Sequence, residues 1–333
     1  SFIFPSNKFV DGTHSLSAAA TMRDGFVSQM GSITLNFSNG NATPPINTGT
    51  FQPFTSPAPA NGQPFMVAAG GDGASGETNS TNVTNLIKNL NPDMFLYLGD
   101  VYNKGTYTEF YNWYGNGQTY FGQFRTITNP VVGNHEYENG AAPGYFDYWN
   151  NVPDYYSYDA GGWHFIALNS NYSVVPVSAS SAQYQWLQQD LTTNTDKCTV
   201  VYYHHPLFNI GPASSTTALT DMWNLMVQKG VDIVLTGHDH TYQRWVPLGL
   251  NGQPDPNGIT EFVAGASGHG VQTISSSDSR VAFSSDANPG ALGALLFAMN
   301  PDGASFSYIN TAGAVIDSGV IPCSGASPDT QPP

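Results

Sequence analysis

From Pro64 onward the chain alternates short apolar runs with amphipathic stretches. PFMVAAG (64–70) and MFLYL (94–98) are apolar runs of strand length. Between them, residues 81–90 place apolar side chains at positions i, i+3, i+4 and i+7, which is the spacing of one face of a helix. The sequence therefore predicts a strand, a helix and a second strand in this stretch.

The same alternation continues to residue 236. Further strands are predicted at NPVV (129–132), GWHFIALN (162–169), CTVVYY (198–203) and DIVLT (232–236), and helices over about 180–191 and in the stretch that ends at Gly230. This order is typical of an α/β domain, whose ligand site lies beyond the strand ends. After residue 240 the pattern is strand-like without helices, so we expect a second sheet that completes a sandwich.

The two ends of the chain differ from this region. Residues 1–62 are rich in Asn, Thr, Pro and Gly, with one alternating stretch at 31–40 that predicts a strand, and we expect them to form an N-terminal extension packed on a main domain at 63–323. Residues 324–333 have the composition of a disordered tail or the start of a linker. The first residues lack an initiator Met, a basic segment and an apolar segment, so we expect the numbering to begin on a mature or trimmed chain.

Composition indicates a folded chain with an acidic, sparsely charged surface. Hydrophobic residues make up 40% and aromatic residues 13% of the 333 residues, enough to bury a sizeable interior, whereas only 10% are charged. Lys and Arg number 9 against 24 Asp and Glu, a formal net charge of −15, which disfavours a nucleic acid duplex as a partner. No run approaches the ~18 apolar residues of a membrane span, so we expect none. The oligomeric state stays open.

Two features favour an extracellular compartment. Neither of the two cysteines, Cys198 and Cys323, has a partner at metal-ligand spacing, and we favour one long-range disulfide over two buried thiols. N-x-S/T triplets fit the same compartment as glycosylation sites, although an Asn- and Thr-rich chain also produces them by accident. They begin at Asn36, Asn41, Asn79, Asn82 and Asn171. We therefore expect a secreted or cell-surface protein.

Polar side chains follow five of the predicted strands, at the point where each strand ends. They are Asp72, Asp100, Asn134, His204, and the pair His238 and His240. Strands of one sheet that run in the same direction end along one edge, so we expect these side chains to meet in one cleft.

This set of side chains suits a site for two metal ions. Carboxylate and amide oxygens mixed with imidazoles favour Zn, Mn or Fe, and a carboxylate between two clusters can bridge two cations. Two ions about 3.5–4 Å apart can activate a water and hold both the attacking and the leaving oxygen of an in-line displacement at phosphorus. The pattern therefore predicts hydrolysis of a phosphate ester.

Five short motifs carry these residues in order: GDG (71–73), GDVY (99–102), GNHE (133–136), HHP (204–206) and GHDH (237–240). Together they resemble the ordered motifs of calcineurin-like metallophosphoesterases, over roughly residues 64–320. Within that superfamily the chain looks closest to purple acid phosphatases and their bacterial relatives, because no DxH histidine follows Asp72 and a tyrosine follows the second aspartate. We therefore expect an α/β fold of four layers, α/β/β/α, with two mixed sheets face to face, in which 63–323 is the catalytic domain.

The resemblance also implies a ligand set. One metal would be held by Asp72, Asp100, Tyr102 and His240, and the other by Asp100, Asn134, His204 and His238, with Asp100 as the bridge. The family's tyrosine stands three residues after the aspartate, whereas Tyr102 stands two after Asp100, so ligation by Tyr102 is left open.

A second departure concerns the acid that protonates the leaving group. Plant and mammalian acid phosphatases carry a histidine pair shortly after the HxP motif, and this chain has FNIGPASS (208–215) there. The acid would therefore come from elsewhere or be water.

The remaining histidines each have two interpretations. His135 is the candidate catalytic residue, which contacts the substrate phosphate or protonates the leaving oxygen, with orientation of a metal ligand as the alternative. His205 and His269 are candidate substrate-binding residues; the alternative is packing or a hydrogen bond to a ligand for His205, and an exposed loop position for His269. His164 is expected to be a core histidine whose hydrogen bonds are satisfied.

The predicted function is hydrolysis of a small phosphate ester by in-line attack of a metal-bound hydroxide. No covalent phosphoenzyme is expected, because no nucleophilic Ser or Cys stands in the motifs. Monoesters, diesters and nucleotides all stay open as substrates. The alternative is a surface-displayed structural or binding module that keeps the fold without useful turnover, and the intact ligand set argues against it.

Overall fold

The computed structural model describes residues 12–21, 27–37, 49–194, 198–286 and 291–323, and the chain divides into two compact units, Ser1–Thr48 and Gly49–Pro333. In the first unit β1 (Gly12–Thr21) pairs antiparallel with β2 (Val27–Phe37). The strand predicted at 31–40 overlaps β2, and β1 was not predicted. The structure draws the boundary after Thr48, whereas the sequence placed it at 62; packing of the first unit on the second stays a prediction.

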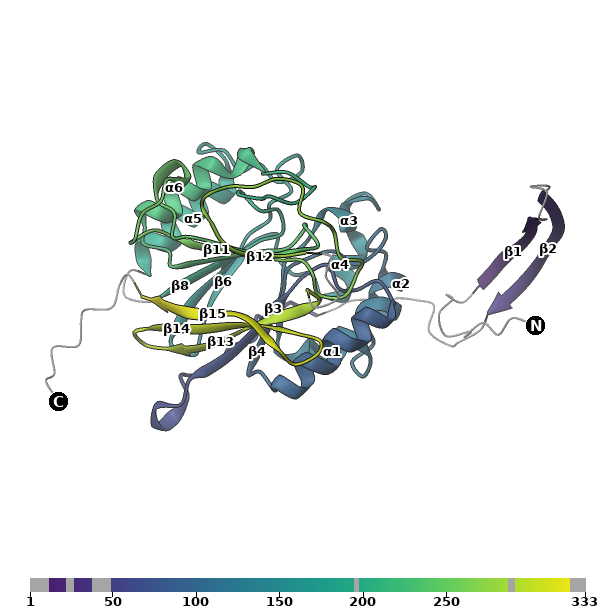
Figure 1. Cartoon of the computed structure of the whole chain (residues 1–333), viewed down its shortest axis with the longest axis horizontal. Coiled ribbons are helices and arrows are strands. Elements are labelled where there is room, and N and C mark those ends of the chain that lie inside the picture. Colours follow the sequence, from purple (N-terminus) through teal and green to yellow (C-terminus); the bar gives the residue numbers. More distant parts are fainter. Residues whose placement is uncertain (1–11, 22–26, 38–48, 195–197, 287–290, 324–333) are drawn as a thin grey trace, which may run out of the picture. The chain divides into compact units, whose positions relative to one another are not determined.

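Two mixed sheets build the second unit (Figure 1). The seven-stranded sheet has the order β12-β10-β11-β9-β8-β7-β6, and the six-stranded sheet has the order β15-β14-β13-β3-β4-β5. The strands of the first are β6 (Tyr156–Ala160), β7 (Trp163–Ala167), β8 (Thr199–Tyr202), β9 (Ile233–Thr236), β10 (Tyr242–Trp245), β11 (Thr260–Ala264) and β12 (Val281–Ser285). Those of the second are β3 (Phe65–Gly70), β4 (Met94–Tyr97), β5 (Thr128–Pro130), β13 (Gly293–Asn300), β14 (Gly303–Asn310) and β15 (Val315–Pro322).

Parallel strands occupy one part of each sheet, and antiparallel strands extend it. Strands β7, β8, β9 and β11 are parallel in the first sheet, as are β3, β4 and β5 in the second. The chain after residue 240 was expected to add a second sheet. It instead extends both, because β10, β11 and β12 join the first and β13, β14 and β15 join the second.

The inner faces of the two sheets share one core. Phe262 on β11 contacts Phe297 on β13 with ring centroids 5.6 Å apart, and Tyr242 on β10 stacks on Tyr308 on β14 at 3.8 Å. Arg244 on β10 forms an ion pair with a carboxylate of β15. Side chains from both sheets therefore interdigitate, as in other packed sheet pairs.

Helices cover the outer faces. Along β8, Val200 and Tyr202 enter the core between the sheets, whereas Val201 and Tyr203 pack in a second cluster with α5 (Ala182–Thr193) and α6 (Thr220–Gln228). On the other side, α1 (Thr78–Leu90) packs its apolar face against the six-stranded sheet. Figure 1 shows α5 and α6 on one side of the sheet pair and α1 on the other. The predicted α/β/β/α fold is confirmed.

Short helical turns fill the stretch between β4 and β6. They are α2 (Tyr107–Glu109), the π-turn Phe110–Tyr114, the 3₁₀ segment Tyr120–Ile127, α3 (Asn134–Tyr137) and α4 (Pro143–Tyr148). The other 3₁₀ turns are Ala60–Gly62, Thr217–Leu219 and Leu250–Gly252.

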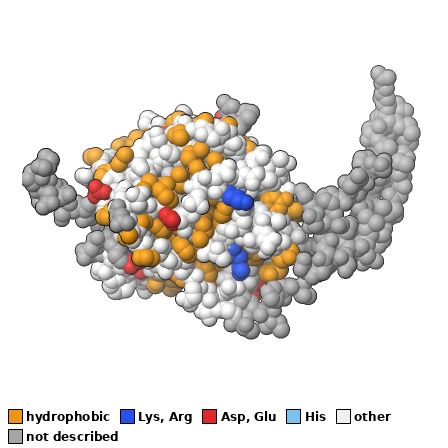
Figure 2. Space-filling view, turned by 90° about the horizontal axis from the view of Figure 1, so that it is seen from below, with side chains coloured by type: hydrophobic (Ala, Val, Ile, Leu, Met, Phe, Trp, Pro, Cys, Tyr) orange, Lys and Arg blue, Asp and Glu red, His pale blue; other side chains and the backbone are white. Residues whose placement is uncertain are grey.

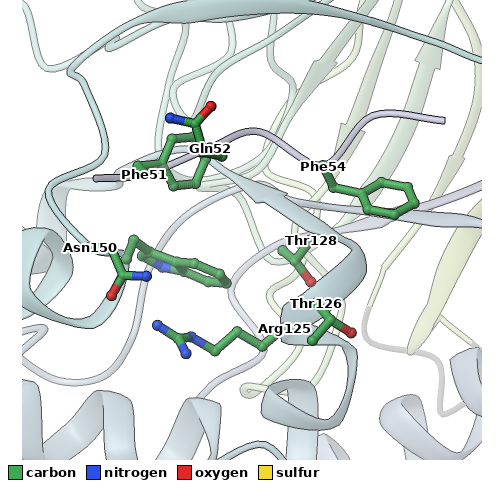
Figure 3. A pocket seen from close by; sticks show the side chains of 8 residues that line it. Phe51, Gln52, Phe54, Arg125, Thr126, Thr128 and Asn150 are labelled. Atoms are coloured by element: carbon green, nitrogen blue, oxygen red, sulfur yellow. The ribbon is translucent and has the colours of Figure 1, made fainter. Parts of the chain in front are cut away.

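Residues 49–62, which the sequence had assigned to the extension, belong to the second unit. The backbone N–H of Phe54 donates to Asn129 Oδ1 at 2.8 Å, and the Phe51 ring lies 5.0 Å from that of Tyr156. With Arg125 and Trp149, the two phenylalanines line a cavity of about 200 Å³ (Figure 3). This segment therefore packs on the sheets of the second unit.

The predicted disulfide is present. Cys198, just before β8, is joined to Cys323, just after β15, with Cα atoms 5.2 Å apart and a separation of 125 positions in sequence. Figure 2 shows a face on which charged side chains are few, in keeping with the composition. None of the helices in the described segments is long and apolar enough to cross a membrane.

Candidate metal centre

Each predicted donor lies just past the end of a strand. Asp72 follows β3, Asp100 follows β4, and Asn134 opens α3 after β5. In the other sheet His204 follows β8, and the GHDH loop follows β9. Because β3, β4 and β5 are parallel, as are β8 and β9, the donors meet at one end of the sheet pair.

The first group of donors surrounds the hydroxyl of Tyr102. That oxygen lies 3.0 Å from Asp72 Oδ1, 3.3 Å from Asp100 Oδ2 and 2.8 Å from His240 Nε2. The two carboxylates are almost wholly buried, with 0% and 1% of each residue exposed. The short spacing between Asp100 and Tyr102 thus still delivers the phenol to the first group.

The second group lies on the other side of Asp100. His204 Nε2 is 3.3 Å from Asp100 Oδ2 and 3.0 Å from Asn134 Oδ1. His238 Nδ1 is 3.2 Å from His204 Nε2. Asp100 therefore stands between the two groups, as the bridging role requires.

Backbone carbonyls orient two of the imidazoles. His204 Nδ1 lies 2.8 Å from Leu98 O, and His240 Nδ1 lies 2.8 Å from Gly270 O. Because Nδ1 of each ring donates to a carbonyl, Nε2 of each ring faces the cluster and can bind a cation once it has no proton.

The loops that carry the donors have unusual backbone geometry. Asp72, Asp100 and His238 have φ angles of 59°, 64° and 68°, in the left-handed region that non-glycine residues seldom occupy. Such residues are typical of functional sites. A Cβ atom at Gly133 would collide with the Asp100 carboxylate, so the GNHE loop can approach Asp100 only with glycine there.

A buried carboxyl, Glu136, joins two of these loops. Its oxygens accept hydrogen bonds from the backbone N–H groups of Val101 at 2.6 Å, Gly133 at 2.7 Å and Asp100 at 3.3 Å. Burial, together with the negative charge of Asp100, raises the pKa of Glu136 to about 8. Its position indicates that it holds the GDVY and GNHE loops together.

Charges within the cluster are strongly coupled. Burial raises the pKa of Asp72 well above its usual value. Burial opposes charge on His204, but the Asp100 carboxylate raises the pKa of His204 to about 10. Burial and the His204 charge lower the pKa of His238 to about 3. The protein without metal therefore keeps a proton on His204 between the carboxylates, which a cation would displace.

The donor set fits two cations of the Zn, Mn or Fe type. Ligand atoms of Asp72, Asp100 and His204 lie within 4.8 Å of one another, as do those of His204, His205 and His238. Carboxylates, imidazoles, an amide oxygen and a phenol suit these ions. The two thiols of the chain are committed to the disulfide.

The family profile of calcineurin-like phosphoesterases matches residues 76–242, which is half of the chain. The chain belongs to this family. Purple acid phosphatase 21 of Arabidopsis thaliana is 34% identical over 121 residues, covering 34% of this chain and 27% of that protein. Purple acid phosphatase 15 of the same plant is 28% identical over 246 residues, covering 62% of this chain and 45% of that protein. The matched part thus spans less than half of either relative.

A solved structure shares the fold. Purple acid phosphatase PPD1 from yellow lupin (Lupinus luteus) superposes with a TM-score of 0.64 at 16% identity, covering 94% of this chain and 60% of that one. The sequence matches confirm the resemblance to purple acid phosphatases inferred from the motifs, and the solved structure confirms the fold.

The other histidines lie around the cluster. His135 Nδ1 lies 2.7 Å from Asn103 O, while its Nε2 lies 3.9 Å from Asp100 Oδ2. The ring of His269 lies 4.1 Å from that of Tyr102, and its Nδ1 lies 2.8 Å from a carboxylate oxygen of Glu77. Side chains of both histidines are partly exposed, so they stand at the rim of the centre.

His205 lies deeper. Ser170 Oγ is 2.9 Å from both its Nδ1 and its backbone nitrogen, and its ring lies 4.5 Å from that of His238. Burial and the neighbouring charge of His204 lower the pKa of His205 to about 2, so it is a neutral group. His164 is a core residue as predicted, with its ring nitrogens 2.9 Å and 2.8 Å from carboxylates of Asp159 and Asp190.

Sequence reasoning missed the residues that hold the loops of the cluster together. Glu136 and Asp239 both stand inside recognised motifs, yet in those two motifs only the metal donors and His135 were given roles. Asp239 accepts hydrogen bonds from Asn209 Nδ2, Thr241 Oγ1 and the Ala213 backbone. The sequence signal that could have found them is an acidic residue that stands inside a metal-binding motif but is not itself a ligand. Nothing in the sequence pattern pointed to Ser170.

Proposed function

We propose that this chain is a secreted phosphoesterase that hydrolyses phosphate esters with two bound metal ions. The observation that supports it is the convergence of six donors from two sheets around one buried carboxylate, Asp100. Asp72, Tyr102 and His240 would hold one ion, Asn134, His204 and His238 the other, and Asp100 both. When bound, such a pair lowers the pKa of a water and withdraws charge from the phosphoryl oxygens.

The residues around the donors would bind the substrate and move a proton. Since the Nδ1–H of His135 faces Asn103 O, its Nε2 faces the cleft. There it would hydrogen-bond the substrate phosphate or give a proton to the ester oxygen as the bond between phosphorus and that oxygen breaks. His269 at the rim would contact the substrate. His205 is more buried, and its position suits either contact with the substrate or orientation of the neighbouring His238 ring.

The extracellular location rests on the disulfide. A buried cystine closing a loop of this length is typical of proteins made outside the reducing cytosol. Of the candidate glycosylation sites, Asn82 is exposed on α1 and is available. Asn171 is buried, with its amide bonded to Val132 O and Asn169 Oδ1, so it would not carry a glycan.

Metal analysis combined with paired rates tests the proposal. The purified full chain should contain two ions and hydrolyse an aryl monophosphate, a bis-aryl phosphate or both, and a chelator should remove both the ions and the activity. The ratio of the two rates would assign the substrate class. A protein that keeps two ions yet hydrolyses neither ester would overturn the enzyme proposal and favour a binding module.

A further inference from the structure

A cavity of about 570 Å³ opens beside the candidate metal centre. Two of the centre's residues, His205 and His238, form part of its wall. The rest of the wall comes from Tyr172 and from the segment 213–218. Its volume lies within the range of pockets that hold small organic molecules.

The wall combines an aromatic ring with small hydroxyl-bearing residues. Tyr172 is 52% exposed, so its ring is available to a ligand. Thr216 and Thr217 add hydroxyl groups, whereas the Ser215 hydroxyl accepts a hydrogen bond from the Asn209 backbone N–H. Among the described residues that line the cavity there is no Asp, Glu, Lys or Arg. The cavity therefore suits an uncharged ligand that has a flat ring and hydroxyl groups.

Buried polar contacts fix this wall. The Asp239 carboxylate, in the metal-binding GHDH loop, accepts the Ala213 N–H at 3.0 Å and Asn209 Nδ2 at 2.8 Å. Gln243 Nε2 donates to Asn209 Oδ1 at 2.6 Å. On the opposite side, Ser170 contacts His205 two residues before Tyr172. The same loops thus position both the donors and the cavity, which is what a preorganised subsite needs.

We propose that this cavity binds the uncharged, ring-bearing alcohol group of the phosphate ester, for which a nucleoside is the best match. Tyr172 would stack on the ring, and the hydroxyls of Thr216 and Thr217 would hydrogen-bond the sugar. A second phosphate at this position would find no cationic side chain in the wall, in a chain of net charge −15. The inference rests on the proposed function and names its substrate class: nucleoside esters rather than polyphosphates.

The test compares two substrates on the metal-loaded full chain. Adenosine monophosphate carries the ring group, and glycerol phosphate is the small control. Tyr172→Ala should lower kcat/KM for adenosine monophosphate by about tenfold or more, the order expected for loss of a base-stacking ring, and leave glycerol phosphate within about twofold. Tyr172→Phe, which keeps the ring, should resemble wild type, as should Val320→Ala at an exposed apolar position outside the cavity.

A binding measurement separates this inference from the proposed function. Calorimetric titration with adenosine needs no turnover, and Ala218→Trp, at an exposed position on the wall, should fill the cavity and weaken binding at least tenfold. Equal losses on both substrates in Tyr172→Ala, or adenosine binding unchanged by Ala218→Trp, would overturn the subsite. Hydrolysis of neither ester by wild-type protein would instead refute the proposed function.

Discussion

Removing the disulfide is predicted to destabilise the fold without disturbing the metal centre. Cys198 precedes β8, whereas His204 follows it, so the bond lies at the opposite end of that strand from the donors. It ties β15, the edge strand of one sheet, to the middle of the other. The variant to compare with wild type is Cys198→Ala combined with Cys323→Ala.

The expected loss follows from the length of the closed loop. With the cysteines 125 positions apart in sequence, the loop-entropy model gives a stabilisation of about 5 kcal/mol at room temperature. A domain of ordinary stability unfolds at a cost of about 5–15 kcal/mol, so the loss would be a large part of the total. Both cysteines are buried, which predicts slow reduction of the folded protein.

Denaturant unfolding of the oxidised, reduced and double-alanine proteins measures the effect. The last two should unfold at similar, lower denaturant concentrations, and rates on an aryl phosphate should match wild type in dilute buffer. Intact mass under non-reducing, alkylating conditions supplies the control for the bond itself. Uptake of two alkyl groups without prior reduction, or a stability difference below about 1 kcal/mol, would refute the reasoning.

Four further predictions concern single side chains. Asp100→Asn should remove most bound metal and abolish activity, as measured by metal analysis and rates; two retained ions with a near-wild-type rate would contradict its bridging position. His135→Ala should keep the metal content and lower kcat by about 10² to 10³, and loss of metal would instead make it an orienting residue. Iron-loaded protein should be violet because of charge transfer from the Tyr102 phenolate to Fe(III), and Tyr102→Phe should be colourless. A visible absorption band that survives the substitution would exclude the phenol as a ligand. Burial opposes charge on His164, but Asp190 and Asp159 raise its pKa above 6.5. The contribution of its ion pairs to the free energy of unfolding is therefore fully present below pH 6.5 and declines as the pH rises through the raised pKa. His164→Asn should therefore lower the unfolding free energy more at about pH 5.5 than at about pH 9, and an equal loss would contradict the ion pairs.

The part of the site that follows strand ends could be predicted from the sequence. Apolar runs fix where β3, β4, β8 and β9 end, and parallel strands bring the residues after them to one edge. Two short strands that contain polar residues, β6 and β10, could not be predicted in this way. β10 follows the last donor and alternates polar with aromatic residues in YQRW, and β6 has the similar YSYDA. Neither is an apolar run.

Contacts that depend on loop conformation could not be predicted. Tyr102 stands one residue closer to the aspartate than the tyrosine of the family does. Because the backbone conformation of the loop decides where the side chain then points, the sequence left the direction of the phenol open. The left-handed geometry of Asp100 and the contacts of Glu136 decide it, and no periodic pattern encodes them. The cavity beside His238 could not be predicted for the same reason: its wall comes from the 213–218 segment and from Tyr172, whose positions depend on loop conformation.

The cost of the donor cluster argues for its chemical role. Three donors in left-handed geometry cost roughly 1–3 kcal/mol each, so roughly 3–9 kcal/mol together, which approaches the whole stability of a domain. Burial of two carboxylates beside one phenol adds to that cost. Apolar residues at these strand ends would give a more stable sandwich, since the core between the sheets is already closed by stacked aromatic rings. A purely structural module would gain nothing from the cluster, whereas binding of cations, as proposed, would offset its cost.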